Sequence, residues 1–269
     1  MLDLEKMTFL TREQLKKQAP TVFALKPSSE VSKKYTHIPT LKVVEDMEKL
    51  GWKVVDAKQV KARKISTQGF QKHLVTFRNP DVVINGEGGD TVFPQILLTN
   101  SHDGKNAFTF TAGLFRMVCE NGLVVADKEF GAIKMRHMGY TFEQLQVKIL
   151  KIVEELPLTV ETLNKMKQVE LNKQQKKSLA RKALTTRFSK DQIKTFKIDL
   201  DKLIDPVRKE DYGSDLWSVF NVIQEKIIEG DFEYVIGTKI RKARQIKNFK
   251  QDLKVNQELF EMATELLPN

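Results

Sequence analysis

The chain has 269 residues, of which 41% are hydrophobic and 30% are charged, and its formal net charge is +10. This length can build one large domain or two smaller ones, and the composition excludes a globally disordered chain. Its apolar runs are far shorter than the roughly 20 residues of a membrane span, and the first 20 residues lack the apolar core of a secretory signal. We therefore expect a folded, cytoplasmic protein of a host cell with no membrane partner.

Cysteine and histidine usage limits the metal chemistry. Cys119 is the only cysteine, so an intrachain disulfide and a cysteine-rich zinc cluster are excluded. The four histidines, His37, His73, His102 and His137, are far apart in sequence and include no pair at metal-ligand spacing. We predict neither a metal nor a cofactor, and only a site assembled from distant loops stays open.

Residues 1–36 predict a loosely structured N-terminal arm. One short helix is expected near residues 11–17, because Thr11 and Gln14 have the spacing of a capping box. Residues 37–140 follow as an α+β body. The body begins with a helix over residues 40–50, where apolar residues recur at helical spacing before a terminating glycine.

Strand patterns dominate the rest of the body. The expected strands span residues 52–64, 73–78 and 92–99, and the first two form a hairpin rich in basic residues. Residues 107–111 follow as a strand or as the entry to a helix. A polar Asp-Gly turn over 100–106 separates them from the strand at 92–99. A short buried helix is expected over 113–121, followed by a strand pair within 123–136.

The remaining residues, 141–269, predict helices separated by short connections. The first helix begins at residue 141, and Pro157 should break or kink it. Further helices are expected over 159–169, 179–188, 216–228 and 239–267, with a linker at 199–211. The predicted fold class is therefore α+β, with an antiparallel sheet and basic hairpin in the N-terminal half and a helical C-terminal half that packs on the body as one domain.

Positive charge is concentrated in three segments. Residues 51–78, 165–190 and 239–254 carry net charges of +6, +8 and +6, which leaves −10 for the rest of the chain. If these segments converge in space they form a polyanion-binding surface, and if they do not they are solvated faces of unrelated elements. In the first segment Phe70 and Phe77 lie among cations, a mixture typical of single-strand binding unless the rings belong to the core.

We therefore predict nucleic acid, with single-stranded DNA favoured, as the partner, ahead of an anionic membrane. The candidate nucleic-acid-binding residues are Lys58, Lys61, Arg63, Lys64, Lys72, Arg78, His102, Lys105, Arg116, Lys239, Arg241 and Lys242.

The segment Asn100-Ser-His-Asp-Gly104 concentrates polar groups. Adjacent Ser, His and Asp do not make a catalytic triad, because neighbours on an extended chain point to opposite sides. A hairpin turn is the favoured interpretation, ahead of a contact with a phosphate or base. Arg116 lies inside an apolar run, so we expect it either to emerge at a surface or to pair with a partner such as Asp103. We expect Asp103→Ala to destabilise the fold and His102→Ala to leave it nearly unchanged, and we predict no catalytic residues and no enzyme activity.

Two strings of residues resemble a known family. Leu98-Thr-Asn-Ser-His-Asp-Gly104 and Ala112-Gly-Leu-Phe-Arg-Met-Val-Cys-Glu-Asn-Gly-Leu-Val124 are similar to the phage/plasmid-like proteins called domain of unknown function 932. The similarity extends from about residue 37 to 267. The resemblance implies a phage, prophage or plasmid setting and supplies no catalytic residues. Its recurrent polar positions match Asn100, His102, Asp103, Arg116 and Asn121.

The resemblance and the basic hairpin together predict a non-enzymatic protein that binds single-stranded DNA in recombination, annealing or replication, with a homo-oligomer left open. The alternative is a protein-interaction module of a mobile element that counters a host defence system.

Overall fold

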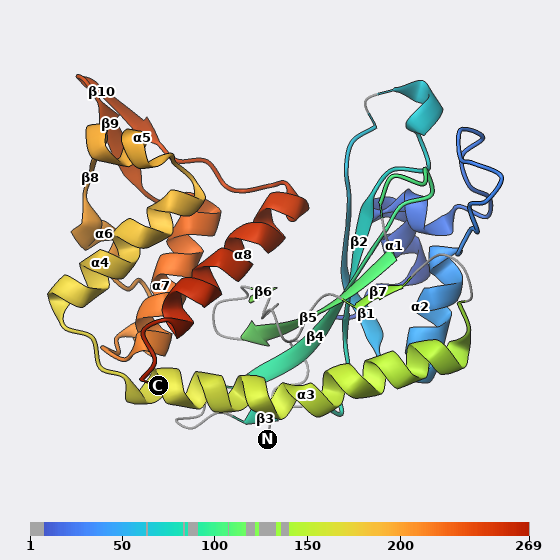
Figure 1. Cartoon of the computed structure of the whole chain (residues 1–269), viewed down its shortest axis with the longest axis horizontal. Helices are drawn as coiled ribbons and strands as arrows, with labels where there is room; N and C mark the ends of the chain where they lie inside the picture. The colour runs from blue at the N-terminus through green and yellow to red at the C-terminus, as the bar shows by residue number, and fades with distance from the viewer. Residues whose placement is uncertain are drawn as a thin grey trace. The chain divides into compact units, whose positions relative to one another are not determined.

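The computed structural model of the chain describes residues 8–62, 64–82, 84–85, 91–106, 108–116, 122–123, 133–135 and 140–268 (Figure 1). The chain divides into two compact units, Met1–Leu156 and Pro157–Asn269, and each is described by itself. No helix in these described ranges is long and apolar enough to cross a membrane.

The helices of unit 1 include the expected N-terminal pair. Helix α1 (Arg12–Gln18) opens with a capping box, in which Gln14 N donates to Thr11 Oγ1 and Thr11 N donates to Gln14 Oε1. A 3₁₀ turn, η2 (Pro20–Phe23), and helix α2 (Thr40–Lys49) follow. The expectation of a loose arm is wrong for this segment, because Leu15, Ala19 and Val22 are at most 1% exposed and belong to the core.

Unit 1 contains an antiparallel sheet, which confirms the predicted fold class. Its strands are β1 (Lys53–Gln59), β2 (His73–Arg78), β3 (Ile84–Asn85), β4 (Thr91–Asn100), β5 (Phe108–Arg116), β6 (Gly122–Leu123) and β7 (Ile133–Met135). Their order is β1-β2-β4-β5-β6, with β3 beside β4 and β7 beside β5. A 3₁₀ turn, η3 (Ile65–Thr67), lies in the long connection between β1 and β2.

The helix expected over residues 113–121 is wrong up to Arg116, the last residue described there. Gly113 to Arg116 continue β5, which pairs with β4 from Thr99↔Thr109 to Val92↔Arg116. A short apolar run fits a buried strand as well as a buried helix, and here the long partner strand decided the outcome. Strands β6 and β7 each pair with β5, whereas we expected them to pair with each other.

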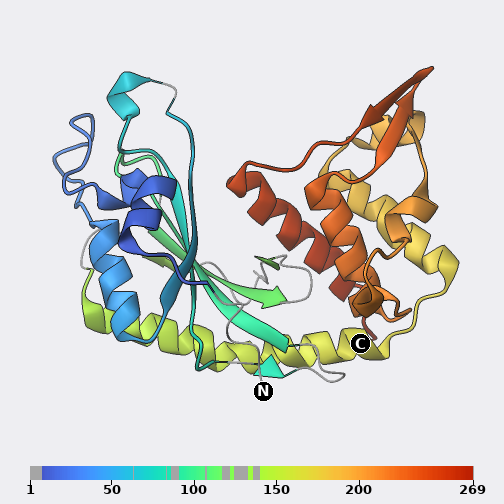
Figure 2. The same ribbon diagram turned by 180° about the vertical axis from the view of Figure 1, so that it is seen from behind.

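One face of the sheet and the neighbouring helices form the core of unit 1. Helices α1 and α2 lie against β1 (Figures 1 and 2). Trp52, Phe77, Phe108 and Met47 are at most 2% exposed there. Burial of such a side chain typically contributes about 1.5–3 kcal/mol to the free energy of unfolding, so this layer stabilises the sheet and the loops that join its strands.

Helix α3 (Phe142–Gln168) runs without a break through Pro157, so of the break or kink that we expected there the break is wrong. Leu145 and Ile149 in its first half belong to the core of unit 1, and Leu163 and Met166 near its end are also buried.

The rest of unit 2 is mainly helical, as expected. Its elements are α4 (Lys173–Ala183), η5 (Leu184–Thr186), α5 (Lys190–Thr195), β8 (Lys197–Ile198), α6 (Leu200–Ile204), η6 (Lys209–Asp211), α7 (Leu216–Glu229), β9 (Glu233–Ile236), β10 (Lys239–Lys242) and α8 (Phe249–Thr264). Helices α4 and α5 begin with capping boxes, formed by Asn172 with Gln175 and by Ser189 with Gln192. On α7, Trp217 stacks on Phe220, and Gly230 ends the helix at φ +72°.

The expected helix over 239–267 is wrong in its first part. Strands β9 and β10 form a hairpin around Gly237 (φ +59°), and β8 adds a third strand in the order β10-β9-β8. Glycine at positive φ allows a tight reversal of the chain without steric strain. The segment therefore forms a hairpin rather than the helix that we expected from its residue pattern.

Candidate nucleic-acid interface

Three connections meet at one end of the unit 1 sheet. We call this region the sheet end and define it as residues 28–37, 60–62, 64–72 and 101–106. Backbone hydrogen bonds join the three connections: His102 N donates to Phe70 O, and Ser28 N donates to His102 O, each at 2.9 Å. Tyr35 Oη also donates to Ser101 O at 3.1 Å. Loops far apart in sequence therefore form one surface.

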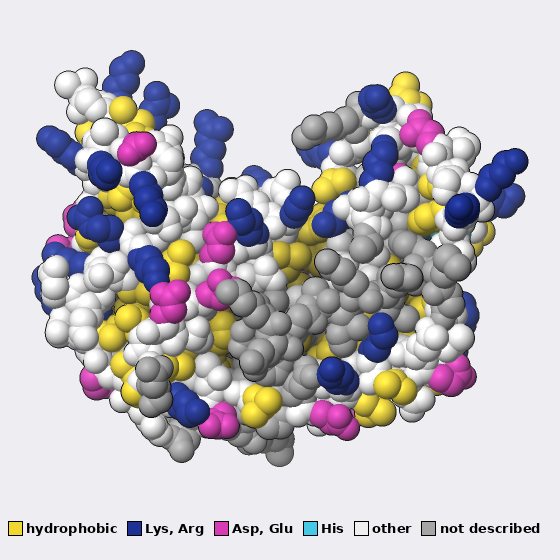
Figure 3. Space-filling model, in the orientation of Figure 1, with side chains coloured by type: hydrophobic (Ala, Val, Ile, Leu, Met, Phe, Trp, Pro, Cys, Tyr) yellow, Lys and Arg dark blue, Asp and Glu magenta, His cyan; other side chains and the backbone are white. Residues whose placement is uncertain are grey.

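The sheet end is strongly basic. Its described residues include six lysines and two acidic residues, Glu30 and Asp103. The exposed cations described there are Lys33, Lys34, Lys61, Lys64 and Lys105, and Lys72 is half-buried. Dark-blue side chains stand over the tips of these connections in Figure 3. Like charges held together on an ordered surface attract a polyanion.

A buried polar network lies beneath this surface. His37 Nε2 is 3.0 Å from His102 Nδ1, and His102 Nε2 is 3.3 Å from Thr40 Oγ1. Thr40 Oγ1 is 2.8 Å from His73 Nε2 and accepts from Asn100 Nδ2 at 2.9 Å. His73, His102, Thr40 and Asn100 have no exposed surface.

The contacts of this network are satisfied by one ordering of protons. His73 Nδ1 lies 3.1 Å from the carbonyl of Gln71, so it carries the hydrogen and His73 Nε2 accepts from the Thr40 hydroxyl. His102 then donates through Nε2 to Thr40 and accepts through Nδ1 from His37. The rings of His73 and His102 are neutral in this arrangement, because each donates through one nitrogen and accepts through the other. Burial lowers the pKa of His73 to about 4, which agrees with a neutral ring.

The network is a brace for the loops rather than a metal centre. The two ring nitrogens of His102 face different partners, so the three histidines do not converge on one point. No group of three His, Cys, Asp or Glu residues suited to a metal ion occurs among the residues that the structure describes. The network instead links α2, β2 and the end of β4 to the loop that carries Lys33 and Lys34.

The structure divides the sequence-based candidates. Lys61, Lys64, Lys72 and Lys105 lie at the sheet end, and Lys58 is exposed on β1 close to it, 3.4 Å from Asp56. Arg63 and the side chain of Arg116 lie outside the described part of the chain.

The prediction for His102 is wrong, because this residue is fully buried and is a member of the brace rather than a surface contact. Phe77 is also fully buried, so of the two interpretations left open for this ring the core one holds. Arg116 ends β5, whereas Asp103 precedes the start of that strand. A contact between these two residues would involve the Arg116 side chain, which lies outside the described part of the chain.

Arg78 also lies away from the sheet end, about 17 Å along β2 from His73. Its guanidinium contacts Gln95 Oε1 at 3.5 Å, and burial lowers its pKa to about 10. Sequence reasoning missed Lys33 and Lys34, because a loop without periodicity gives no reason to place them beside the Asp-Gly turn.

The other candidates, Lys239, Arg241 and Lys242, lie on β10 in unit 2 and are exposed.

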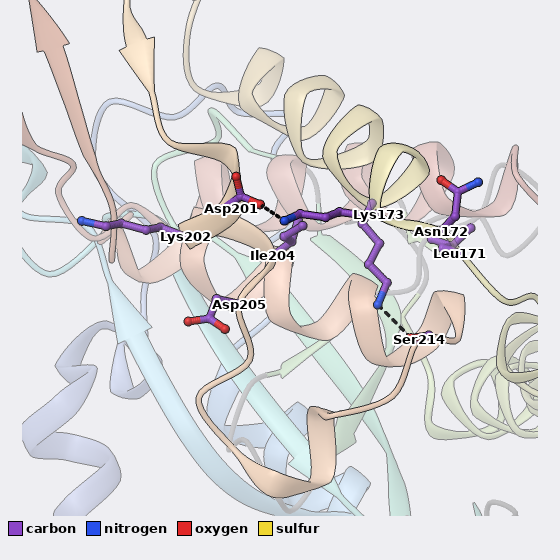
Figure 4. A pocket seen from close by; sticks show the side chains of 9 residues that line it. Leu171, Asn172, Lys173, Asp201, Lys202, Ile204, Asp205 and Ser214 are labelled. Carbon is purple, nitrogen blue, oxygen red and sulfur yellow. Dashed lines mark hydrogen bonds and ion pairs between the residues drawn. The ribbon is translucent and has the colours of Figure 1, made fainter.

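Unit 2 also has a cavity of about 700 Å³ near the start of α4 (Figure 4). Two of the lysines that line it have partners: Lys173 pairs with Asp201 at 3.0 Å, and Lys176 donates to Ser214 at 3.0 Å. These contacts join α4 to α6 and to the segment before α7, and we assign no ligand to this cavity.

Comparison with known proteins places the chain in a family. The model of the family described as "Domain of unknown function (DUF932)" matches residues 27–260, so the chain belongs to this family. It is 29% identical to the UPF0380 protein YafZ of Escherichia coli K12 over 259 residues, 96% of this chain and 92% of the relative. The UPF0380 protein YfjQ of the same strain is 29% identical over 265 residues, with the same coverage. No solved structure matches the chain.

Proposed function

We propose that this protein binds nucleic acid through the sheet end of unit 1 and that single-stranded DNA is its preferred partner. The observation that carries the proposal is the joining of three basic connections into one ordered surface by hydrogen bonds and a buried brace. Phosphate neutralisation by Lys and Arg supplies most of the free energy of non-specific nucleic-acid binding.

The preference for single strands rests on the shape of this surface. It consists of loops that expose lysine side chains, and its described residues present no helix or two-stranded ribbon of the kind that fits a duplex groove. Phe70 and Tyr35 are half-buried beside the cations, so part of each ring lies where a base can stack. In a phage, prophage or plasmid such a protein would act in recombination, annealing or replication without an active site of its own.

The test compares two charge-reversal variants in titrations of labelled single-stranded DNA over a salt series. Lys61→Glu with Lys64→Glu changes the sheet end, and Lys16→Glu with Lys17→Glu changes two exposed lysines on α1 as a matched control. The slope of log affinity against log salt should fall by about 1.4 in the first variant, because each phosphate contact contributes about 0.7. The control should retain the wild-type slope.

Equal behaviour of the two variants would remove the sheet end as the binding surface. An absence of binding at low salt would reject the function itself and favour the alternative, a module that binds a protein of a host defence system.

A further inference from the structure

Strands β9 and β10 of unit 2 form a ribbon whose tip projects as two strands beyond β8, which pairs with β9 at Tyr234 and Val235. All four residues of β10 are exposed, and the tip extends beyond α5 in Figures 1 and 2. A Cβ built on Gly237 at the tip would meet no atom within 4 Å, so the turn is open to solvent. Arg187 fixes the stem of the ribbon, where the chain enters from α7 and leaves after β10, because its guanidinium donates to the backbone carbonyls of Ile227 and Arg244.

The ribbon carries cations on both faces. Residues directly opposite in an antiparallel pair share a face, and β10 pairs Lys239 with Ile236 and Arg241 with Tyr234. Lys239 and Arg241 therefore lie on one face, and Lys242 lies on the other, 3.5 Å from Asp231. Figure 3 shows dark-blue side chains around this ribbon at the upper left. A ligand that offers negative charge to both faces at once suits this arrangement.

The aromatic side chains at the ribbon's base are committed to internal packing. Phe196 stacks on Tyr234 with ring centroids 5.2 Å apart, and Phe188 contacts Phe196 at 5.4 Å and Tyr234 at 5.1 Å. Rings that pack on one another do not offer faces to unpaired bases. The apolar groups exposed on the ribbon are instead aliphatic, Ile240 at 69% and Ile236 at 39%.

We infer that the β9–β10 ribbon is a second nucleic-acid-binding element that enters a groove of duplex DNA. The major groove is about 12 Å wide and admits a two-stranded ribbon, with phosphates along both of its edges. Lys239 and Arg241 face one edge and Lys242 faces the other. Ile240 shares the face of Lys242 and lies nearer the tip, where it reaches thymine methyl groups at the groove floor. The inference uses residues separate from those of the proposed function.

The experiment measures binding of the full chain to a labelled duplex and, separately, to a labelled single strand over a salt series. The ribbon variant replaces Lys239, Arg241 and Lys242 with Gln, and a control replaces Lys165, Lys173 and Lys254, three exposed lysines on α3, α4 and α8. The ribbon variant should lose about tenfold or more in duplex affinity, and its salt slope should fall by about 2.7, at about 0.9 per phosphate contact. Its single-strand affinity and the control's duplex affinity should stay at the wild-type value.

A further variant, Ile240→Ser, removes the apolar contact without changing charge. It should lower duplex affinity severalfold with an unchanged salt slope, and circular dichroism should confirm the wild-type fold for every variant. Wild-type duplex binding by the Lys239/Arg241/Lys242 variant would overturn the inference, as would an equal loss on both polymers. A change in oligomeric state at constant duplex affinity would also overturn it, because the exposed β10 edge would then pair copies of the chain. The single-strand titration reports on the sheet end alone, so the two proposals fail separately.

Discussion

His102 shows how a single residue in a functional-looking motif can serve the scaffold. It lies in the Asn-Ser-His-Asp-Gly string, yet both ring nitrogens are used inside the protein and its backbone bonds two other loops. Asp103, in contrast, is partly exposed, and its carboxylate accepts from the backbone of Lys105 at 3.1 Å. The structure therefore reverses the expected importance of these two neighbours for stability.

We predict that His102→Ala lowers the free energy of unfolding by about 2–4 kcal/mol, since it leaves buried partners unsatisfied and opens a cavity. Asp103→Ala should cost about 1 kcal/mol or less, because its position is partly hydrated. Denaturant titration of both variants checks the order. A larger loss in Asp103→Ala would show that the turn, and not the network, holds the sheet end together.

Acid sensitivity should originate at His73. Burial lowers the pKa of this ring to about 4, below its usual value near 6.5, so the unfolded chain binds the extra proton first as pH falls. Stability is therefore fully present above about pH 6.5 and is lost as pH decreases towards 4. Between pH 7 and pH 5 we expect a loss on the order of 2 kcal/mol from this group.

The measurement compares the wild-type protein with His73→Gln, whose amide keeps a donor and an acceptor but does not titrate. The variant should be less stable at pH 7 and should lose less stability on acidification. Identical pH dependence in the two proteins would assign the acid sensitivity to other groups.

At the scale of elements, the sequence predicted what depends on local pattern. Strand β2 was expected at its observed bounds, and α1, α2 and α7 begin within about two residues of their expected starts. The errors at Gly113–Arg116 and Lys239–Lys242 share a cause, because both segments are strands only by virtue of a partner strand. The spacing of apolar residues along the sequence cannot reveal which strand will be that partner.

The candidate site was predictable only in part for the same reason. Lys61 and Lys64 were found because they follow a strand pattern in a basic segment. Their neighbours Lys33 and Lys34, and the brace of His37, His73 and His102, depend on contacts between residues about 30 to 70 positions apart. No local spacing carries that information.

The start of the ribbon offers a test of backbone geometry. Gly230 ends α7 at φ +72°, and a Cβ there would lie 2.5 Å from the carbonyl carbon of Arg244. We expect Gly230→Ala to cost about 2–4 kcal/mol, from left-handed strain and from overlap with the stem of the ribbon. Gly237→Ala is the matched control, because Gly237 also has positive φ but its Cβ would meet open space, so only about 1–2 kcal/mol is expected. Thermal melts rank the two variants, and equal losses would contradict a close approach at Gly230.

At the scale of the whole molecule, the three basic segments belong to different units. Residues 51–78 lie in unit 1, whereas 165–190 and 239–254 lie in unit 2. The two proposed binding surfaces, the sheet end and the β9–β10 ribbon, therefore belong to different units of one chain. If one surface takes single strands and the other takes duplex, binding at one raises the effective concentration at the other.

We therefore predict that a duplex with a single-stranded tail binds more tightly than either part alone, by about 100-fold at moderate salt. Competition titrations with tailed duplex, blunt duplex and single strand measure this difference. Changing either the sheet end or the ribbon should reduce the tailed substrate to the affinity of the remaining part. Equal affinity for tailed and blunt duplex would mean that the two surfaces do not act together.

The capping boxes of α1, α4 and α5 have a consequence for how the protein responds to its surroundings. In each of them the residue that closes the box is glutamine, namely Gln14, Gln175 or Gln192. A carboxylate in that place would be neutralised by acid, whereas an amide keeps its bond to the cap at every physiological pH. The hydrogen bonds of these three capping boxes are therefore insensitive to acidification. In hydrogen-exchange measurements at pH 5, the first amides to lose protection should be those around His73 and Asn100.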